Sequence, residues 1–124
     1  MEHAENIRDV YSAAGLWLKP GGLFAHTIGF NAHDTSGLWN GHWTYSNFAW
    51  RIIRGRCSYL INREPHSAHI AALRDNNFGI ICDDTYQKAN LFERKQLARE
   101  FRFLTDRDLI TYTAFILGRK KLEL

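Results

Sequence analysis

The chain is poor in the residues that define several classes of protein. Its 124 residues include two cysteines, two prolines and no apolar run long enough to span a bilayer. Two cysteines cannot form a disulfide framework, and Cys82 lies in an apolar stretch, so we expect a buried free thiol there. The N-terminal residues do not have the basic and then apolar pattern of a secretory signal. These absences favour a cytoplasmic protein.

The chain also has little net charge. Sixteen basic and thirteen acidic residues give a net charge of +3 with histidine neutral, and the basic residues are dispersed apart from short groups at 51–56 and 119–121. No nucleic-acid-binding motif accompanies them, so we do not expect a nucleic-acid partner. The length suits one domain with one core, which we place at 1–124.

The chain begins with a predicted helix, a tight turn and a strand. Apolar residues recur at helical spacing over 7–18, and Lys19 would lie in the last turn as a cation at the negative end of the helix dipole. Pro20 cannot continue the helix, and Gly21-Gly22 can take positive φ. The apolar run 23–30 is bounded by glycines, which predicts a strand buried on both faces and hence a piece of an α/β sheet.

Local patterns predict the remaining elements. Capping residues, proline, the asparagine pair and apolar spacing mark their bounds. We expect a helix from Ser46 or Asn47 to Arg54, with Phe48, Trp50 and Ile53 on its packed side. An extended segment over 59–63 and a helix from Pro65 to Asn76-Asn77 should follow. The remaining elements are a strand over 78–82 followed by a polar stretch, a short helix over 91–104, a helix start at 105–108 and a strand over 111–118.

The connection over 31–45 has neither helical nor strand periodicity. Connections of this length in compact domains are usually functional or disordered. Its aromatic and histidine residues argue against disorder, because such side chains gain stability by burial. We therefore predict a lid or a wall of an acceptor site.

The order of these elements resembles the C-terminal half of a class I S-adenosylmethionine-dependent methyltransferase. The resemblance spans nearly the whole chain, and its most specific parts are Leu18-Lys19-Pro20-Gly21-Gly22 and the segment from Asp108 to Lys120. Met1-Glu2-His3 looks like the Leu-Glu-His that follows the fourth strand in the methyltransferase-11-like branch. The resemblance implies an α/β fold with a partial Rossmann-like sheet, made of strands 5, 6 and 7 with flanking helices, in which the final strand is antiparallel.

The same resemblance implies S-adenosylmethionine as cofactor and a small-molecule methyl acceptor. In that family the cofactor is held mainly by a glycine-rich loop after the first strand and an acidic residue after the second. No Gly-x-Gly pattern follows a strand here, so the resemblance implies a single incomplete domain over 1–124, the substrate-facing half. Glu2 and His3 would lie at the cofactor edge, and we expect the chain alone to bind the cofactor weakly or not at all.

Candidate site residues follow the strand over 23–30. The C-terminal end of a parallel strand opens on the ligand crevice of an α/β sheet. This places His26 and His33 as candidate catalytic bases and Thr27 and Asn31 as acceptor contacts. For His26 a core histidine is the commoner alternative.

Two further candidate acceptor contacts are Trp43 and Arg63. Trp43 could stack on a flat acceptor, although core packing is commoner for such a residue. Arg63 could bind an anionic acceptor, with surface pairing to Glu64 or another acid as the alternative. Related sequences often carry two acids in the loop after this strand, and Gly29 and Ala32 stand at those positions.

The histidines and cysteines do not have the spacing of metal ligands. His66 and His69 form the one tight pair, no Cys-x-x-Cys is present, and two histidines on a helix are usually surface residues. We therefore expect no metal.

Two functions remain open at this point. The first is methyl transfer from S-adenosylmethionine to a small molecule, and the second is a truncated or degenerate copy that acts as a non-catalytic binding or interaction module. In the family's strand order, the strand over 23–30 lies between the final strand and a fourth strand that this sequence lacks. We therefore expect its open edge to pair in a homodimer or with a complementary N-terminal half.

Overall fold

The computed structural model describes residues 1–57 and 60–123. Its elements are α1 (Ile7–Trp17), β1 (Leu23–Gly29), η1 (Gly41–Thr44), α2 (Asn47–Arg54), α3 (His66–Asp75), β2 (Phe78–Gln87), η2 (Arg94–Gln96), η3 (Arg99–Phe101), α4 (Asp106–Ile110) and β3 (Thr111–Lys120). The elements labelled η are short 3-10 helices. The extended segment predicted over 59–63 begins at Tyr59, which lies outside the described residues, and 60–63 form no strand.

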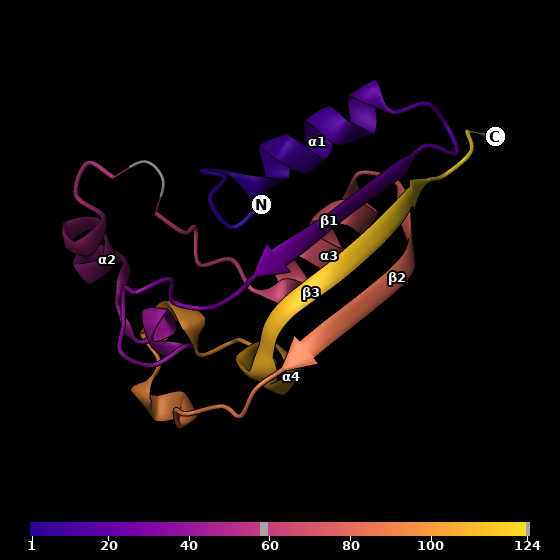
Figure 1. The fold of residues 1–124 in the computed structure, drawn as a ribbon. Helices are drawn as coiled ribbons and strands as arrows, with labels where there is room; N and C mark the ends of the chain where they lie inside the picture. The colour runs from indigo at the N-terminus through magenta and orange to yellow at the C-terminus, as the bar shows by residue number, and fades with distance from the viewer. Residues whose placement is uncertain (58–59, 124) are drawn as a thin grey trace.

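The last strand in the sequence is the central strand of the sheet. The strand order is β1-β3-β2, and both outer strands pair antiparallel with β3 (Figure 1). β1 and β2 therefore run in the same direction on opposite sides of β3. The predicted α/β fold with an antiparallel final strand and flanking helices is confirmed, whereas its identity as a methyltransferase sheet stays a prediction.

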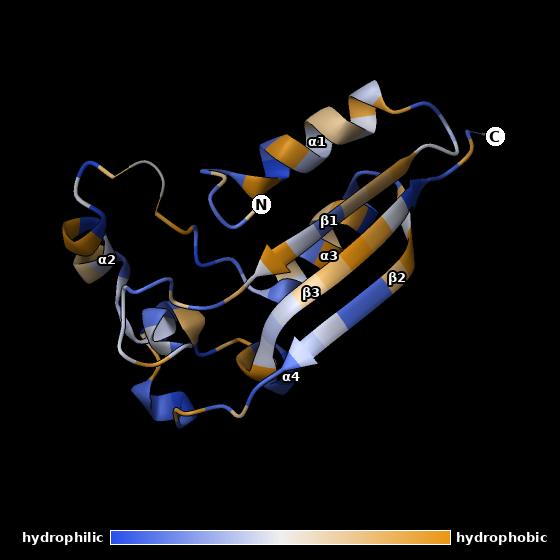
Figure 2. Ribbon diagram, viewed as in Figure 1, coloured by the Kyte–Doolittle hydropathy of each residue, from blue (hydrophilic) through white to orange (hydrophobic). Residues whose placement is uncertain are grey.

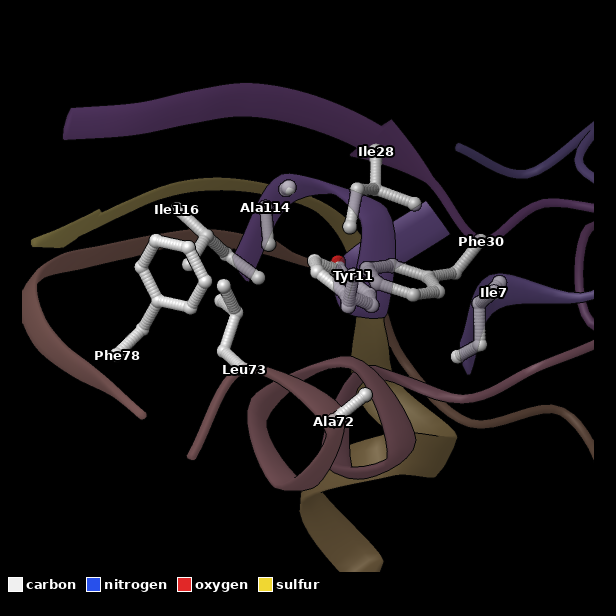
Figure 3. Close-up of a cluster of buried hydrophobic side chains, with 10 residues drawn as sticks. Ile7, Tyr11, Ile28, Phe30, Ala72, Leu73, Phe78, Ala114 and Ile116 are labelled. Atoms are coloured by element: carbon white, nitrogen blue, oxygen red, sulfur yellow. The ribbon is translucent and has the colours of Figure 1, made fainter. Parts of the chain in front are cut away.

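One face of the sheet carries the main hydrophobic core. Helices α1 and α3 pack against this face and against each other, and the close-up in Figure 3 shows their side chains meeting those of the strands. The buried members of this core are Ile7, Tyr11, Ala14, Ile28, Phe30, Ala72, Leu73, Phe78, Ala114 and Ile116.

The opposite face of β1 is open. Leu23, Ala25 and Thr27 are exposed, while Ile28 is fully buried on the helix side. The prediction that this strand is buried on both faces is wrong, because both packed helices lie on one side of the sheet. Hydrophobic residues nevertheless continue along β1 and β3 (Figure 2), and Phe115, beside Thr27, is 41% exposed.

The C-terminal end of α1 is held by a cation from the other end of the chain. The helix ends at Trp17, so Lys19 does not lie in its last turn as predicted. Lys120 on β3 takes that role, since its ammonium donates hydrogen bonds to the carbonyls of Gly15 and Leu18, the latter at 2.9 Å. A cation therefore lies at the negative end of the α1 dipole, as predicted, but it comes from a residue distant in sequence.

A second, smaller core lies beyond the end of the sheet. Trp43 in η1 packs with Leu97, Leu104 and Leu109, and Phe92 and Phe101 cover the edge of this cluster. The helix predicted over 91–104 is wrong, because this stretch forms only η2 and η3. The apolar residues are spaced unevenly here, so they do not define one continuous helical face.

Three other predictions need correction. β2 continues to Gln87 rather than ending at Cys82, because its polar half still pairs with β3. Cys82 is only partly buried. Ser46 caps α2 as expected, but of its predicted packed residues only Trp50 is buried.

Among the described residues, no helix is both long enough and apolar enough to cross a membrane.

Candidate functional site

The C-terminal end of β1 leads into a strained turn. Asn31 Oδ1 accepts a hydrogen bond from the His33 amide at 3.0 Å. His33 and Asp34 then adopt φ values of 46° and 64°, in the left-handed region that non-glycine residues rarely enter. Such strain is found at functional sites, and here it accompanies a defined backbone conformation of the turn that carries His33.

The N-terminal segment is held against this turn by Asn62. The Asn62 amide donates to the Glu2 carbonyl at 2.8 Å, and its side-chain nitrogen donates to the carbonyls of Met1 and Ala4 at 3.1 and 2.8 Å. These three bonds fix the backbone on both sides of Glu2. Glu2 and the residue after it are therefore attached to the fold despite their terminal position.

Glu2 and His33 converge over Gly29. A Cβ atom at position 29 would lie 3.5 Å from both Glu2 Oε1 and His33 Nε2, and 3.4 Å from the Asn31 side-chain nitrogen. His3 joins the group, with its ring centroid 5.1 Å from that of His33 in an edge-to-face arrangement. One ligand atom each from Glu2, His3 and His33 lies within 4.8 Å of the other two.

The charges in this cluster favour an ionised carboxylate. Burial is the largest influence on the pKa of Glu2 and raises it, but backbone hydrogen bonds from Glu2 itself and Gly29 and the neighbouring α-ammonium outweigh it. The pKa of Glu2 is therefore lowered overall. Nε2 of His33 is buried and has no hydrogen-bond partner among the described residues.

His26 belongs to a different, buried network. The Tyr11 hydroxyl lies 2.7 Å from His26 Nε2 and 2.8 Å from His69 Nδ1. A single hydroxyl can donate to only one of them, so it must accept from the other. Burial lowers the pKa of His26 to about 4 and that of His69 to about 3, and raises the pKa of Tyr11. The side chain of His26 thus packs in the core.

The two histidines of α3 are buried, so their expected surface position is wrong. His66 is 5% exposed and its Nε2 lies 2.7 Å from Asp83 Oδ1. His69 is fully buried. Their spacing to Leu73 places all three on one helical face, and this signal could have predicted their burial.

Trp43 belongs to the second core and is hydrogen-bonded to the backbone of Arg63. Trp43 is fully buried and its indole N–H donates to the Arg63 carbonyl at 2.9 Å. The Arg63 guanidinium lies 4.6 Å from the ring centres of Trp50 and Phe101. It donates to the carbonyls of His42 and Tyr45 and to Asn47 Oδ1.

These contacts give Trp43 and Arg63 a structural function. Burial lowers the pKa of Arg63 to about 10, yet the guanidinium remains charged at neutral pH. The expected alternative, a surface pair with Glu64, does not form, because Arg63 is only 5% exposed. Contact of either residue with an acceptor stays a prediction.

The predicted site residues therefore separate into groups. Glu2, His3, Asn31 and His33 gather at the end of β1. His26 faces the main core, and Thr27 is exposed on the open face of the sheet. Sequence reasoning placed Glu2 and His3 at a cofactor edge and did not join them to His33, because the contact depends on Asn62 holding the N-terminal segment.

Comparison with known proteins gives no relative. No family model, no curated protein and no solved structure matches this chain.

Proposed function

We propose that this chain forms the acceptor-facing part of an S-adenosylmethionine-dependent methyltransferase acting on a small molecule. The observation that carries the proposal is the strand order β1-β3-β2, with the last strand inserted antiparallel between two strands of common direction. The resemblance implies that the strand over 23–30 lies beside the final antiparallel strand, as β1 lies beside β3. The connection over 31–45, which follows β1, then forms the acceptor side.

The outer edge of β1 supports the same proposal. The Gly22 carbonyl accepts from the Lys120 amide and the Phe30 amide donates to the Tyr112 carbonyl, so by strand alternation the amides of Leu23, Ala25 and Thr27 point to the outer edge. Among the described residues no strand pairs with that edge. A parallel fourth strand from a complementary half would pair there, and we propose such a half as the partner.

The described residues at the end of β1 leave little room for a cofactor. The cavity at the end of β1 has a volume of about 10 Å³, room for roughly one water molecule. Its lining includes Glu2, Asn31 and Arg63 but no glycine-rich loop that follows a strand. We therefore propose that the groups that bind S-adenosylmethionine come from the complementary half.

Two measurements test the proposal. The translated frame upstream of the Met1 codon, or a neighbouring gene, should encode a glycine-rich strand-turn-helix followed by an acidic residue at the end of a second strand. Calorimetric titration should show micromolar S-adenosylmethionine binding once that segment is joined or co-expressed, and none by residues 1–124 alone. Micromolar binding by this chain alone would refute the division of function between two halves.

The second candidate is a non-catalytic interaction module of the same fold. It is favoured by Gly29 and Ala32, which stand where related sequences carry acids, and Ala32 is 2% exposed. If the reconstituted protein binds the cofactor but methylates no acceptor in a metabolite mixture, the module is the better description.

A further inference from the structure

We propose that Glu2, His3 and His33 form a binding site for a single divalent transition metal ion, with Zn²⁺ as the expected ion. The site lies at the C-terminal end of β1 and uses two imidazole nitrogens and one carboxylate oxygen. It would bind zinc whether or not the sheet belongs to a methyltransferase.

The donor atoms are close to the spacing that a metal requires. They lie within 4.8 Å of one another, whereas ligands of a tetrahedral zinc ion with bonds of about 2.1 Å are about 3.4 Å apart. His3 is exposed and lies outside both hydrophobic cores. The donor atoms must approach one another by at most about 1.4 Å to close the site, which is within the range of a side-chain rotation.

Two of the three ligands are positioned by the fold before any ion arrives. Glu2 is held between the three hydrogen bonds from Asn62, and His33 is held by the strained turn and by Asn31. One oxygen of Glu2, Oε2, lies 3.3 Å from the α-ammonium of Met1. The other, Oε1, faces the same point above Gly29 as His33 Nε2.

The unpartnered nitrogen of His33 is the second observation that points to a ligand. Burying a polar atom without a hydrogen bond costs free energy, and native structures rarely leave such atoms unsatisfied. His33 Nε2 is buried without a partner among the described residues. A metal ion bound to this nitrogen would remove that cost.

The donor set indicates the ion and its chemistry. Two histidines and one carboxylate are the ligands of catalytic zinc sites and of 2-His-1-carboxylate iron sites, and three protein ligands leave a coordination position open. An ion held here could coordinate a hydroxyl or carboxylate of a small molecule and lower the pKa of a bound hydroxyl. The ligand class we assign to the site is therefore an oxygen donor bound through the metal.

Zinc binding can be measured on the intact chain by competition with a chromophoric chelator. Cys57 is an exposed free thiol, so the measurements should use a Cys57→Ser background to remove a competing ligand. We expect one equivalent of Zn²⁺ bound with a dissociation constant in the micromolar range or below. The Co²⁺ form should show visible absorption bands of a four- or five-coordinate site.

Single substitutions identify the ligands. Glu2→Gln, His3→Gln and His33→Asn should each weaken binding by more than about tenfold, since even outer-sphere partners of metal ligands contribute 10–100-fold. Asparagine tolerates the left-handed φ of position 33, so this variant should fold normally, as circular dichroism would verify. Asp34→Asn is the matched control, because Asp34 is an exposed carboxylate in the same turn, and it should leave the affinity unchanged.

Dependence on His33 separates the proposed site from zinc binding by the N-terminal residues alone. Binding in the millimolar range only, or micromolar binding that a folded His33→Asn variant leaves unchanged, would overturn the proposal. Zn²⁺ should also raise the melting temperature of the Cys57→Ser chain but not that of its His33→Asn derivative.

Discussion

Asp108 accepts two hydrogen bonds from Ser67, one from its backbone amide at 2.9 Å and one from its hydroxyl at 2.7 Å. The same carboxylate caps its own helix, because Oδ2 accepts from the Thr105 amide. A single buried carboxylate thus joins the first turns of α3 and α4, which lie 41 residues apart in sequence.

Replacing Asp108 should therefore destabilise two helix starts together. Asp108→Ala leaves the amides of Ser67 and Thr105 without their acceptor, and we expect the free energy of unfolding to fall by about 3 kcal/mol. Urea denaturation measures the change. Asp106→Asn is the control, since the Asp106 side chain is 98% exposed and its loss should cost less than about 0.5 kcal/mol. Equal effects of the two substitutions would contradict the capping assignment.

The chain should lose stability in mild acid. Burial lowers the pKa of His42 and His69 from the usual 6.5 to about 3, so both are neutral in the folded state and protonate more readily when unfolded. Their contribution to the free energy of unfolding is complete above pH 6.5 and is lost as the pH falls toward about 3. For each of these histidines, the free energy of unfolding should fall by up to about 2 kcal/mol between pH 6.5 and pH 5.

Denaturation at a series of pH values measures this loss. The window between about pH 6.5 and pH 5 is the informative one, because most carboxylates titrate below it. His69→Gln should flatten part of the slope in this window. A parent chain with constant stability there would show that these histidines are not neutral and buried.

Lys120 should stabilise α1 from a distance. Lys120→Met removes the ammonium that binds the carbonyls of Gly15 and Leu18, and the free energy of unfolding should fall by about 1–2 kcal/mol. Amide exchange in the last turn of α1 should accelerate more than exchange in α3. The neighbouring exposed Lys121→Met provides the control and should change neither measurement.

The outer edge of β1 should cause association of the free chain. Sedimentation at increasing concentration should show dimers or larger species, because the edge has unpaired backbone groups and exposed apolar neighbours. Ala25→Pro should reduce association, since the amide of Ala25 points away from β3 and its removal breaks no bond within the sheet. Ala25→Val keeps that amide and should associate like the parent.

A stable monomer at high concentration, with the amides of Ala25 and Thr27 protected from exchange, would refute this prediction. It would mean that the edge is covered by something other than a second strand.

The parts of the structure that sequence predicted well are those with local causes. The cap at Thr105, the turn with positive φ at Gly21 and the end of α3 at Asn76 each depend on residues within one turn. The family resemblance, rather than a local pattern, predicted that the first strand pairs with the last. Neither the local patterns nor the resemblance required knowledge of side-chain packing.

The parts that sequence missed depend on contacts between distant segments. Lys120 replaced Lys19 at the end of α1 because β3 passes beside that helix end. Glu2 and His3 meet His33 only because Asn62 fixes the N-terminal segment. No periodicity or spacing in the sequence encodes these pairs.

The position of β3 has a consequence for synthesis of the chain. Among the described residues, β1 and β2 pair only with β3, which spans Thr111–Lys120 and is the last of the three strands in the sequence. Both outer strands are therefore synthesised before their partner, so the sheet can close only after β3 has left the ribosome. Until then, the backbone groups of β1 and β2 that will bond to β3 have no partner in the sheet and are open to chaperones or to aggregation.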